Sequence, residues 1–291
     1  MYELALPLLI GLIAAALLFD FLNGLHDAAN SIATVVATRL LSPVTAVIFA
    51  AFFNFAAYFL ALAFPGLQKV AETIGKGLVD QDIVTPAVIF GALCGAMFWN
   101  VLTWLKGIPS SSSHALIGGL IGAAMAHSGL THIQWSGLNL TLLAIVLSPL
   151  LGMILAMLIM LLSSWGLKGA TANRAERSFR VLHLISSAAY SVAHGLNDAQ
   201  KTMGSRITRL SQHQGFSASL GGSGVVFGAS LMGIPVSTTH TITGAIVGSG
   251  AARRASAVRW AVAGRVVIAW IITIPASAAV GALFYYLTTI F

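Results

Sequence analysis

The sequence predicts an all-α, polytopic integral membrane protein built from two related halves. Hydrophobic residues make up 57% of its 291 residues and charged residues only 8%, a composition that excludes an ordinary soluble domain. Apolar stretches long enough to cross a hydrocarbon core of about 30 Å recur along the chain. Two pairs of similar polar strings interrupt these stretches, and they indicate an internal repeat.

Nine segments account for the predicted helices. Seven are apolar membrane spans, at 4–22, 44–64, 84–105, 139–162, 179–193, 215–232 and 260–290. Two more, at 108–126 and 234–250, are rich in Gly, Ser and Thr, and we expect them to be broken or re-entrant helices. The first segment has no positive charge before its apolar run, so we interpret it as a span rather than a cleaved signal peptide.

Two pairs of polar strings recur in register. The first pair, the Asp strings, is Asn-Gly-Leu-His-Asp-Ala-Ala-Asn at 23–30 and His-Gly-Leu-Asn-Asp-Ala-Gln-Lys at 194–201. The second pair, the Ser strings, is Gly-Ile-Pro-Ser-Ser-Ser-Ser-His at 107–114 and Gly-Ile-Pro-Val-Ser-Thr-Thr-His at 233–240. Chance explains both pairs poorly, so we infer two homologous halves.

The predicted organisation is a first membrane repeat at 1–165, a basic linker at 166–177 and a second membrane repeat at 178–291. Arg253 and Arg254 follow the second Ser string, whereas no basic residue closely follows the first. Halves inserted in opposite orientations would differ in this way. Inverted repeats are the usual architecture of secondary transporters.

Basic residues also predict the orientation of the chain. They exceed acidic residues by 15 to 8 and cluster in two places. The clusters are Lys168, Arg174, Arg177 and Arg180, followed by Arg253, Arg254 and Arg259. By the positive-inside rule the linker is cytoplasmic and the uncharged termini are exoplasmic. A nucleic-acid partner is the weaker interpretation of this charge. The lone Cys94 indicates packing rather than a disulfide or metal site.

The Ser strings have the pattern of helix starts inside the protein. Pro is favoured in a first helical turn, and Ser or Thr caps the free N–H groups there. Such an end attracts an anion through unpaired N–H groups and the positive end of the helix dipole. The candidate substrate ligands are Ser111, Ser112, Ser113, Ser237, Thr238 and Thr239. The alternative is that these hydroxyls only cap kinked helices or let helices pack closely.

The Asp strings suit a cation. Asp27 and Asp198 repel an anion but bind a proton or a metal cation that travels with it. Asn30, Asn197 and Gln200 offer neutral polar groups beside them. Lys201 either neutralises anion charge or extends to the membrane interface. The histidines of the strings are either proton relays or packing residues: they are His26, His114, His194 and His240.

These four ordered strings resemble the inorganic phosphate transporter (PiT) family, over nearly the whole chain. The resemblance implies a helical carrier of inverted repeats that moves inorganic phosphate with a cation. It places Asp27, Asn30, Asn197 and Asp198 on the family's paired signature. The strings resemble the bacterial low-affinity permeases most, because His26 stands where sodium-coupled relatives have Asn. The resemblance thus implies H⁺ rather than Na⁺ coupling, with phosphate carried as a neutral complex of a divalent metal.

The second half is shorter than the first. Asp27 and Asp198 are 171 positions apart but His114 and His240 only 126, so the second half lacks 45 residues between its strings. The tetrapeptide at 201–204, Lys-Thr-Met-Gly, also resembles Glu-Thr-Ile-Gly at 72–75. We hypothesise that a segment equivalent to about 33–75 was lost at this junction. The alternative is natural asymmetry between the halves.

Four functions fit these observations. The first is a phosphate symporter with no bound cofactor, with a homo-oligomer left open. A second is a permease for sulfate or another tetrahedral oxyanion. A third is a shortened family member with impaired transport. A fourth, an intramembrane metalloenzyme using His26, Asp27, His194 and Asp198, is disfavoured because no metal-ligand spacing such as His-x-x-x-His occurs. We therefore predict a transporter rather than an enzyme.

Overall fold

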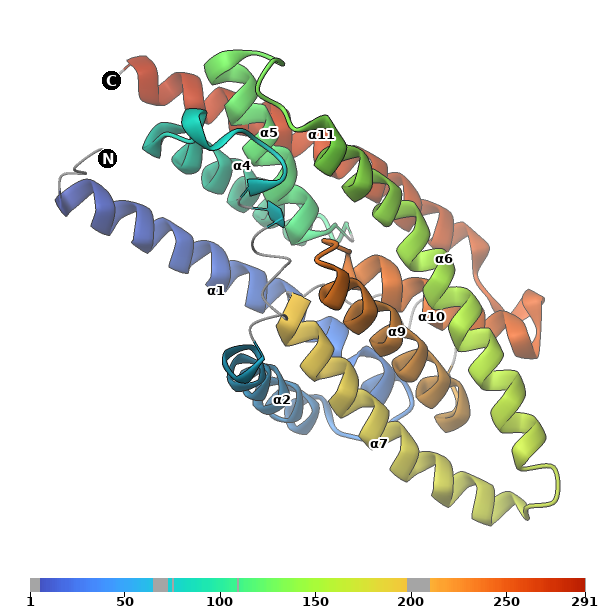
Figure 1. The fold of residues 1–291 in the computed structure, drawn as a ribbon. Coiled ribbons are helices and arrows are strands. Elements are labelled where there is room, and N and C mark those ends of the chain that lie inside the picture. Colours follow the sequence, from blue (N-terminus) through green and yellow to red (C-terminus); the bar gives the residue numbers. More distant parts are fainter. Residues whose placement is uncertain (1–5, 65–72, 75, 109, 198–209, 291) are drawn as a thin grey trace.

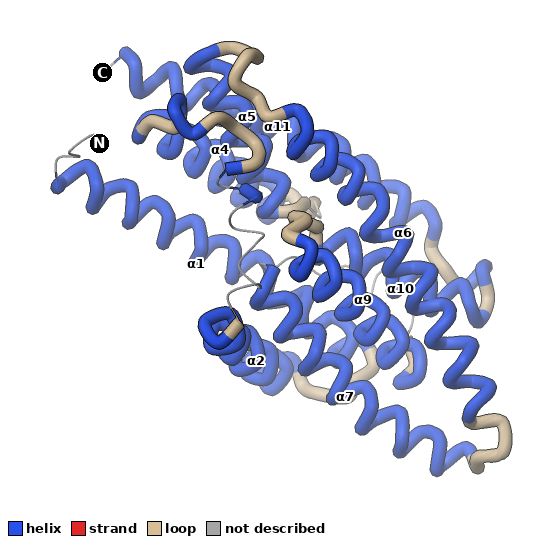
Figure 2. The backbone as a smooth tube through the Cα atoms, in the orientation of Figure 1, coloured by secondary structure: helices blue, strands red, loops and turns tan. Residues whose placement is uncertain are grey.

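The computed structural model describes residues 6–64, 73–74, 76–108, 110–197 and 210–290, without the side chains of 25–30, 197, 257 and 262. All its regular elements in these ranges are helices (Figure 2), which confirms the predicted all-α class. The long helices are α1 Leu6–Ala37, α2 Pro43–Ala63, α4 Pro86–Leu105, α5 Ser112–Ser128, α6 Trp135–Gly166, α7 Ala172–Asn197, α9 Gln212–Met232, α10 Thr238–Arg253 and α11 Trp260–Ile290. Short 3₁₀ helices lie at Gln81–Ile83 (η2) and Ala255–Ala257 (η3).

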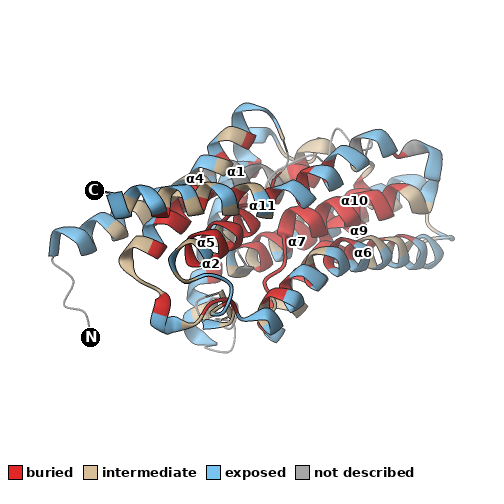
Figure 3. Cartoon of the chain, turned by 90° about the horizontal axis from the view of Figure 1, so that it is seen from above, coloured by how far each residue is buried: buried red, intermediate tan, exposed pale blue. Residues whose placement is uncertain are grey.

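Six of the described helices are long and apolar enough to cross a membrane: α1, α2, α4, α6, α9 and α11. Helices α5 and α10, with 17 and 16 residues, are shorter. Viewed from above, buried residues concentrate on α5, α9 and α10, while α6 and α11 expose much of their surface (Figure 3). The two short helices are therefore surrounded by longer helices with exposed apolar surfaces, as expected for re-entrant segments.

The two halves interlock through equivalent contacts. Helix α5 packs against α4 of its own half and α11 of the other, whereas α10 packs against α9 and α6. Equivalent residues are 126 positions apart. They include the internal prolines of α6 and α11, Pro149 and Pro275. Helices α5 and α10 begin side by side and run toward opposite ends of the molecule (Figure 1), which confirms the inverted repeat.

Glycines set the close approach of these helices. A Cβ on Gly118 or Gly122 would overlap α11, and one on Gly244 or Gly248 would overlap backbone carbonyl groups of α6. Small residues let backbones approach closely in membranes, where packing rather than hydrophobic burial joins helices. Close packing at glycines therefore holds α5 against α11 and α10 against α6.

Helix α2 has no counterpart among the described helices of the second half. It packs against α7 and α1 and contains 21 residues. The corresponding connection between α7 and α9 is the 14 residues 198–211, too few for an equivalent helix. The second repeat is therefore shortened, as predicted.

The basic segment forms part of a helix. Helix α6 ends at Gly166 and α7 begins at Ala172, so much of the predicted linker at 166–177 belongs to the first turns of α7. One ion pair lies there, from Arg180 to Glu176, with 3.4 Å between Nε and Oε1 and both side chains more than half exposed.

Candidate functional site

Each Ser string ends in a capped helix start. The Ser111 hydroxyl accepts a hydrogen bond from the His114 amide at 3.2 Å, and Ser237 accepts one from the His240 amide at the same distance. Both caps have extended backbones. Our expectation that Pro would lie in the first turn is wrong for Pro235, which precedes α10 by three residues because Ser237 takes the N-cap position.

The two helix starts meet in the interior. The rings of His114 and His240 lie 4.6 Å apart, centroid to centroid, at 68°. His240 also stacks on Trp270 of α11, with 3.8 Å between centroids. Both histidines are fully buried, as are Ser112, Thr238 and Thr239, and Ser113 is 6% exposed. The structure therefore brings the predicted ligands of both halves to one buried region.

Helix α4 adds a polar group that the sequence analysis missed. Asn100 is 1% exposed, and neither its carbonyl oxygen nor its amide nitrogen has a hydrogen-bond partner among the described residues. One turn on, the Thr103 and Ser110 hydroxyls lie 2.8 Å apart. The sequence did offer a signal for Asn100, because it is a single amide within an apolar span. Placing such a polar side chain in a membrane costs free energy unless it faces a polar interior. It has no repeat partner, because Val226 occupies the equivalent position.

Helix α7 brings the second Asp string against the second Ser string. The Tyr190 hydroxyl donates to the Thr238 carbonyl oxygen at 3.3 Å. The Tyr190 ring also stacks on His194, with 5.9 Å between centroids, and His194 is fully buried. Gly195 lies against Asn54 and Ala57 of α2, leaving no room for a Cβ. The α2 helix of the first half thereby supports the end of α7.

The predicted cation-coupling residues are placed only in part. The first Asp string lies within α1, although the side chains of His26, Asp27 and Asn30 are outside the description. Asn197 ends α7, again without a described side chain. The remaining predicted residues, Asp198, Gln200 and Lys201, lie outside the described residues.

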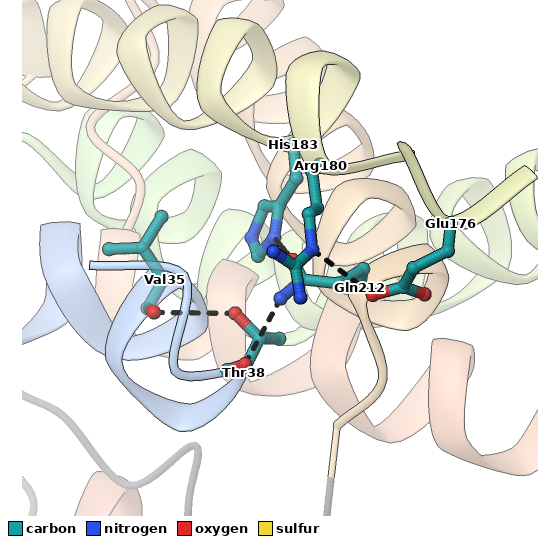
Figure 4. Close-up of polar contacts among 6 residues, drawn as sticks. All are labelled: Val35, Thr38, Glu176, Arg180, His183 and Gln212. Atoms are coloured by element: carbon teal, nitrogen blue, oxygen red, sulfur yellow. Dashed lines mark hydrogen bonds and ion pairs between the residues drawn. The ribbon is translucent and has the colours of Figure 1, made fainter. Parts of the chain in front are cut away.

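A buried hydrogen-bond chain ties together α7, α9 and α1 (Figure 4). Gln212 donates from Nε2 to the Thr38 carbonyl oxygen at 3.0 Å, so its Oε1 is free to accept from His183 Nδ1, also at 3.0 Å. Nearer the Asp string on α1, the Thr34 and Ser219 hydroxyls lie 2.8 Å apart. These contacts fix the later turns of α1 against the second half.

The electrostatics of the Ser-string region suit an anion that can leave again. Within the part of the chain that the structure describes, no Asp, Glu, Lys or Arg side chain is buried. Attraction would come instead from backbone N–H groups and from the dipoles of two helices that start together. Hydroxyl groups add donors without a fixed charge.

A separate groove between α6 and α9 has different chemistry. Its volume is about 490 Å³, and its lining is almost entirely aliphatic, with Ser148 as an exception. Such a surface suits lipid chains rather than a small oxyanion.

Known proteins resemble the chain along nearly its whole length. The model of the phosphate transporter family matches residues 23–205 and 201–281. A probable low-affinity inorganic phosphate transporter of Rhizobium meliloti (strain 1021) is 51% identical, with 97% of each chain covered. One of Bacillus subtilis (strain 168) is 35% identical, with 98% of each covered. The solved structure titled "The sodium-dependent phosphate transporter" has a TM-score of 0.83 and 22% identity, with 98% of this chain and 100% of that chain covered.

The comparisons also bear on the shortened half. The alignment with the Rhizobium relative spans 329 positions, 38 more than the 291 residues of this chain, so at least that many positions face gaps here. The two segments matched by the family model overlap at residues 201–205. That overlap includes the tetrapeptide at 201–204, which can be aligned in two ways. The sequence comparisons thus support the hypothesis that a segment was lost at this junction.

Proposed function

Because this chain belongs to the phosphate transporter family, whose members are carriers rather than enzymes, we propose that it moves inorganic phosphate across the bacterial inner membrane. The mechanism is secondary active transport by alternating access around a site made by both halves. The observation that carries this proposal is the meeting of two Ser-capped helix starts at His114 and His240.

The phosphate ligands in this proposal are the hydroxyls and first-turn N–H groups of both Ser strings. A tetrahedral oxyanion presents acceptors in several directions, and two converging helix ends offer donors from opposite sides. Sulfate has the same shape and lacks only the ionisable proton. Asn100 adds an amide that can donate to a phosphate oxygen.

The coupling cation in this proposal is H⁺ rather than Na⁺, with phosphate carried as a complex of a divalent metal. The Asp strings supply the cation side of the site, with Asp27 and Asp198 as its acidic groups. The basic segment around Arg174 and Arg177 faces the cytoplasm and the termini face outward. A homo-oligomer is compatible with this arrangement.

Uptake into proteoliposomes tests the proposal. Purified protein is reconstituted, and entry of radiolabelled phosphate is followed with a pH gradient or a sodium gradient imposed separately. We expect accumulation driven by the pH gradient alone. Strong inhibition by excess sulfate would favour a permease for tetrahedral oxyanions in general. Accumulation driven only by sodium would overturn the coupling assignment. No accumulation under either gradient would overturn the carrier itself.

A second candidate is a carrier impaired by its shortened second half. It is favoured by α2 of the first half, which supports α7 and has no equivalent among the described residues of the second half. Uptake by this chain is compared with that of a variant in which a segment equivalent to 33–75 is inserted at residues 201–204. Much faster uptake by the lengthened chain would support impairment, and equal uptake would exclude it.

A further inference from the structure

We propose that His114 and His240 together form a proton-binding site of the carrier in addition to the Asp strings, taking up one shared proton when the oxyanion binds. The inference rests on the proposed phosphate transport and adds to it the group that links proton to substrate. It assigns a role to two side chains that phosphate binding by the Ser strings does not itself require.

The first observation is that these imidazoles are buried and unsatisfied. Neither nitrogen of either ring has a hydrogen-bond partner among the described residues, and both side chains are fully buried. The His240 ring lies near the backbone of Ile145 without the geometry of a hydrogen bond. A buried polar group without a partner is costly and needs a reason, such as a functional role.

The second observation is that the two rings are each other's neighbours. They come from equivalent positions of the two halves and lie 4.6 Å apart between centroids. A protonated imidazole can donate to the acceptor nitrogen of a neutral neighbour, so two adjacent rings can hold a single shared proton. Stacking on Trp270 holds His240 in place and offers an aromatic face to a positive ring.

The position of the pair links proton to anion. Both histidines lie in the first turn of a helix, where the dipole is positive. A positive charge is unfavourable there while the site is empty. A bound phosphate reverses this, because an anion within a few ångströms favours the charged form of a nearby imidazole. By linkage, the proton then raises phosphate affinity by the same factor.

Few other ionisable side chains come from the elements around the pair. Helix α6 and η3 contribute none. The described ionisable groups of the other packed elements are Asp20 of α1, Asp82 of η2, Cys94 of α4, His213 of α9, and Arg265, Tyr285 and Tyr286 of α11. Helix α7 adds Tyr190 and His194 on its side facing α10, and the pair's own helices carry His127 and Arg253. Within the described side chains, the ring contacts of the pair are with each other and with Trp270.

Calorimetry of phosphate binding tests this inference. Titrations of purified protein in buffers of different ionisation enthalpy give the number of protons taken up per phosphate bound. The variants are His114→Gln and His240→Gln, with His→Asn at each position as a second pair should Gln impair folding. The control is His132→Gln, because His132 is a partly exposed histidine bound to Asp80 at 3.1 Å.

We expect wild type and the control to take up about one proton per phosphate beyond what the ionisation of phosphate itself requires. The variants of His114 and His240 should still bind phosphate but take up no such extra proton. Unchanged proton uptake in the variants would overturn the inference and move the proton to another group, such as the Asp strings. If the wild-type protein takes up no extra proton on binding phosphate, that result alone would overturn the inference. Failure of wild-type protein to bind phosphate would instead refute the proposed function.

Discussion

Substituting Gly122 by Ala should separate α5 from α11 and destabilise the protein. A Cβ at this position would overlap the Ala278 carbonyl oxygen, whereas ordinary contact begins at 3.4 Å. The helices must therefore move apart by on the order of 1 Å, and dispersion contacts along the interface weaken. Overpacking of this kind costs about 1–3 kcal/mol. The carbonyl belongs to backbone, so no side-chain rotation relieves the overlap.

The assay is thermal unfolding of the purified protein, with Gly248→Ala as the equivalent change in the other half. Its Cβ would overlap the Met153 carbonyl oxygen of α6. At roughly 3 °C per kcal/mol, both variants should lower Tm by about 3–9 °C. The control is Gly264→Ala in α11, where a Cβ would meet no atom within 4 Å. Its Tm should stay level or rise, because Ala is favoured over Gly in helices. A Gly122→Ala variant as stable as this control would refute the close packing.

Two further predictions concern hydrogen bonds. Ser111→Ala and Ser237→Ala each remove a helix cap, so each should lower the free energy of unfolding by about 1 kcal/mol and also weaken phosphate binding. The control is Ser42→Ala, which removes the exposed cap of α2: thermal unfolding should show lower stability, and phosphate titration should show unchanged affinity. An equal loss of phosphate affinity in this control would contradict a specific role of the Ser111 and Ser237 hydroxyls. Gln212→Leu leaves His183 Nδ1 and the Thr38 carbonyl oxygen unpaired. It should lower the free energy of unfolding by about 1–3 kcal/mol, which a lower Tm would show. An unchanged Tm would show that these hydrogen bonds do not hold the three helices together.

Much of the architecture could be predicted because it depends on local patterns. Span length, the strings at 107–114 and 233–240, and their matching offsets lead to most of the helices and to their inverted arrangement. The span predicted at 179–193 is an exception: it lies in the helix α7, which is not among the six described helices apolar enough to cross a membrane. Hydroxyl residues before an apolar run predict a cap, and Ser111 and Ser237 are the caps. The shortened second half could be inferred from the offsets alone.

Other features depend on tertiary contacts that a single sequence does not reveal. Asn100 is one amide in an apolar helix without a repeat partner, and only packing shows that it faces the interior. The contact between His114 and His240 joins positions 126 residues apart, and nothing local in the sequence predicts it. The length of α1 was underestimated because its polar string ends the apolar run but continues the helix. The predicted roles of Asp27 and Asp198 remain predictions.

The most direct test of a single phosphate site built from both halves is the phosphate affinity of matched variants. Ser113→Ala and Thr239→Val remove equivalent hydroxyls from the two Ser strings, and phosphate binding is titrated calorimetrically at fixed pH. A hydrogen bond to a charged group contributes about 1.5–3 kcal/mol, so each variant should bind phosphate about tenfold or more weakly than wild type. Unchanged affinity in either variant would contradict a site shared by the two halves.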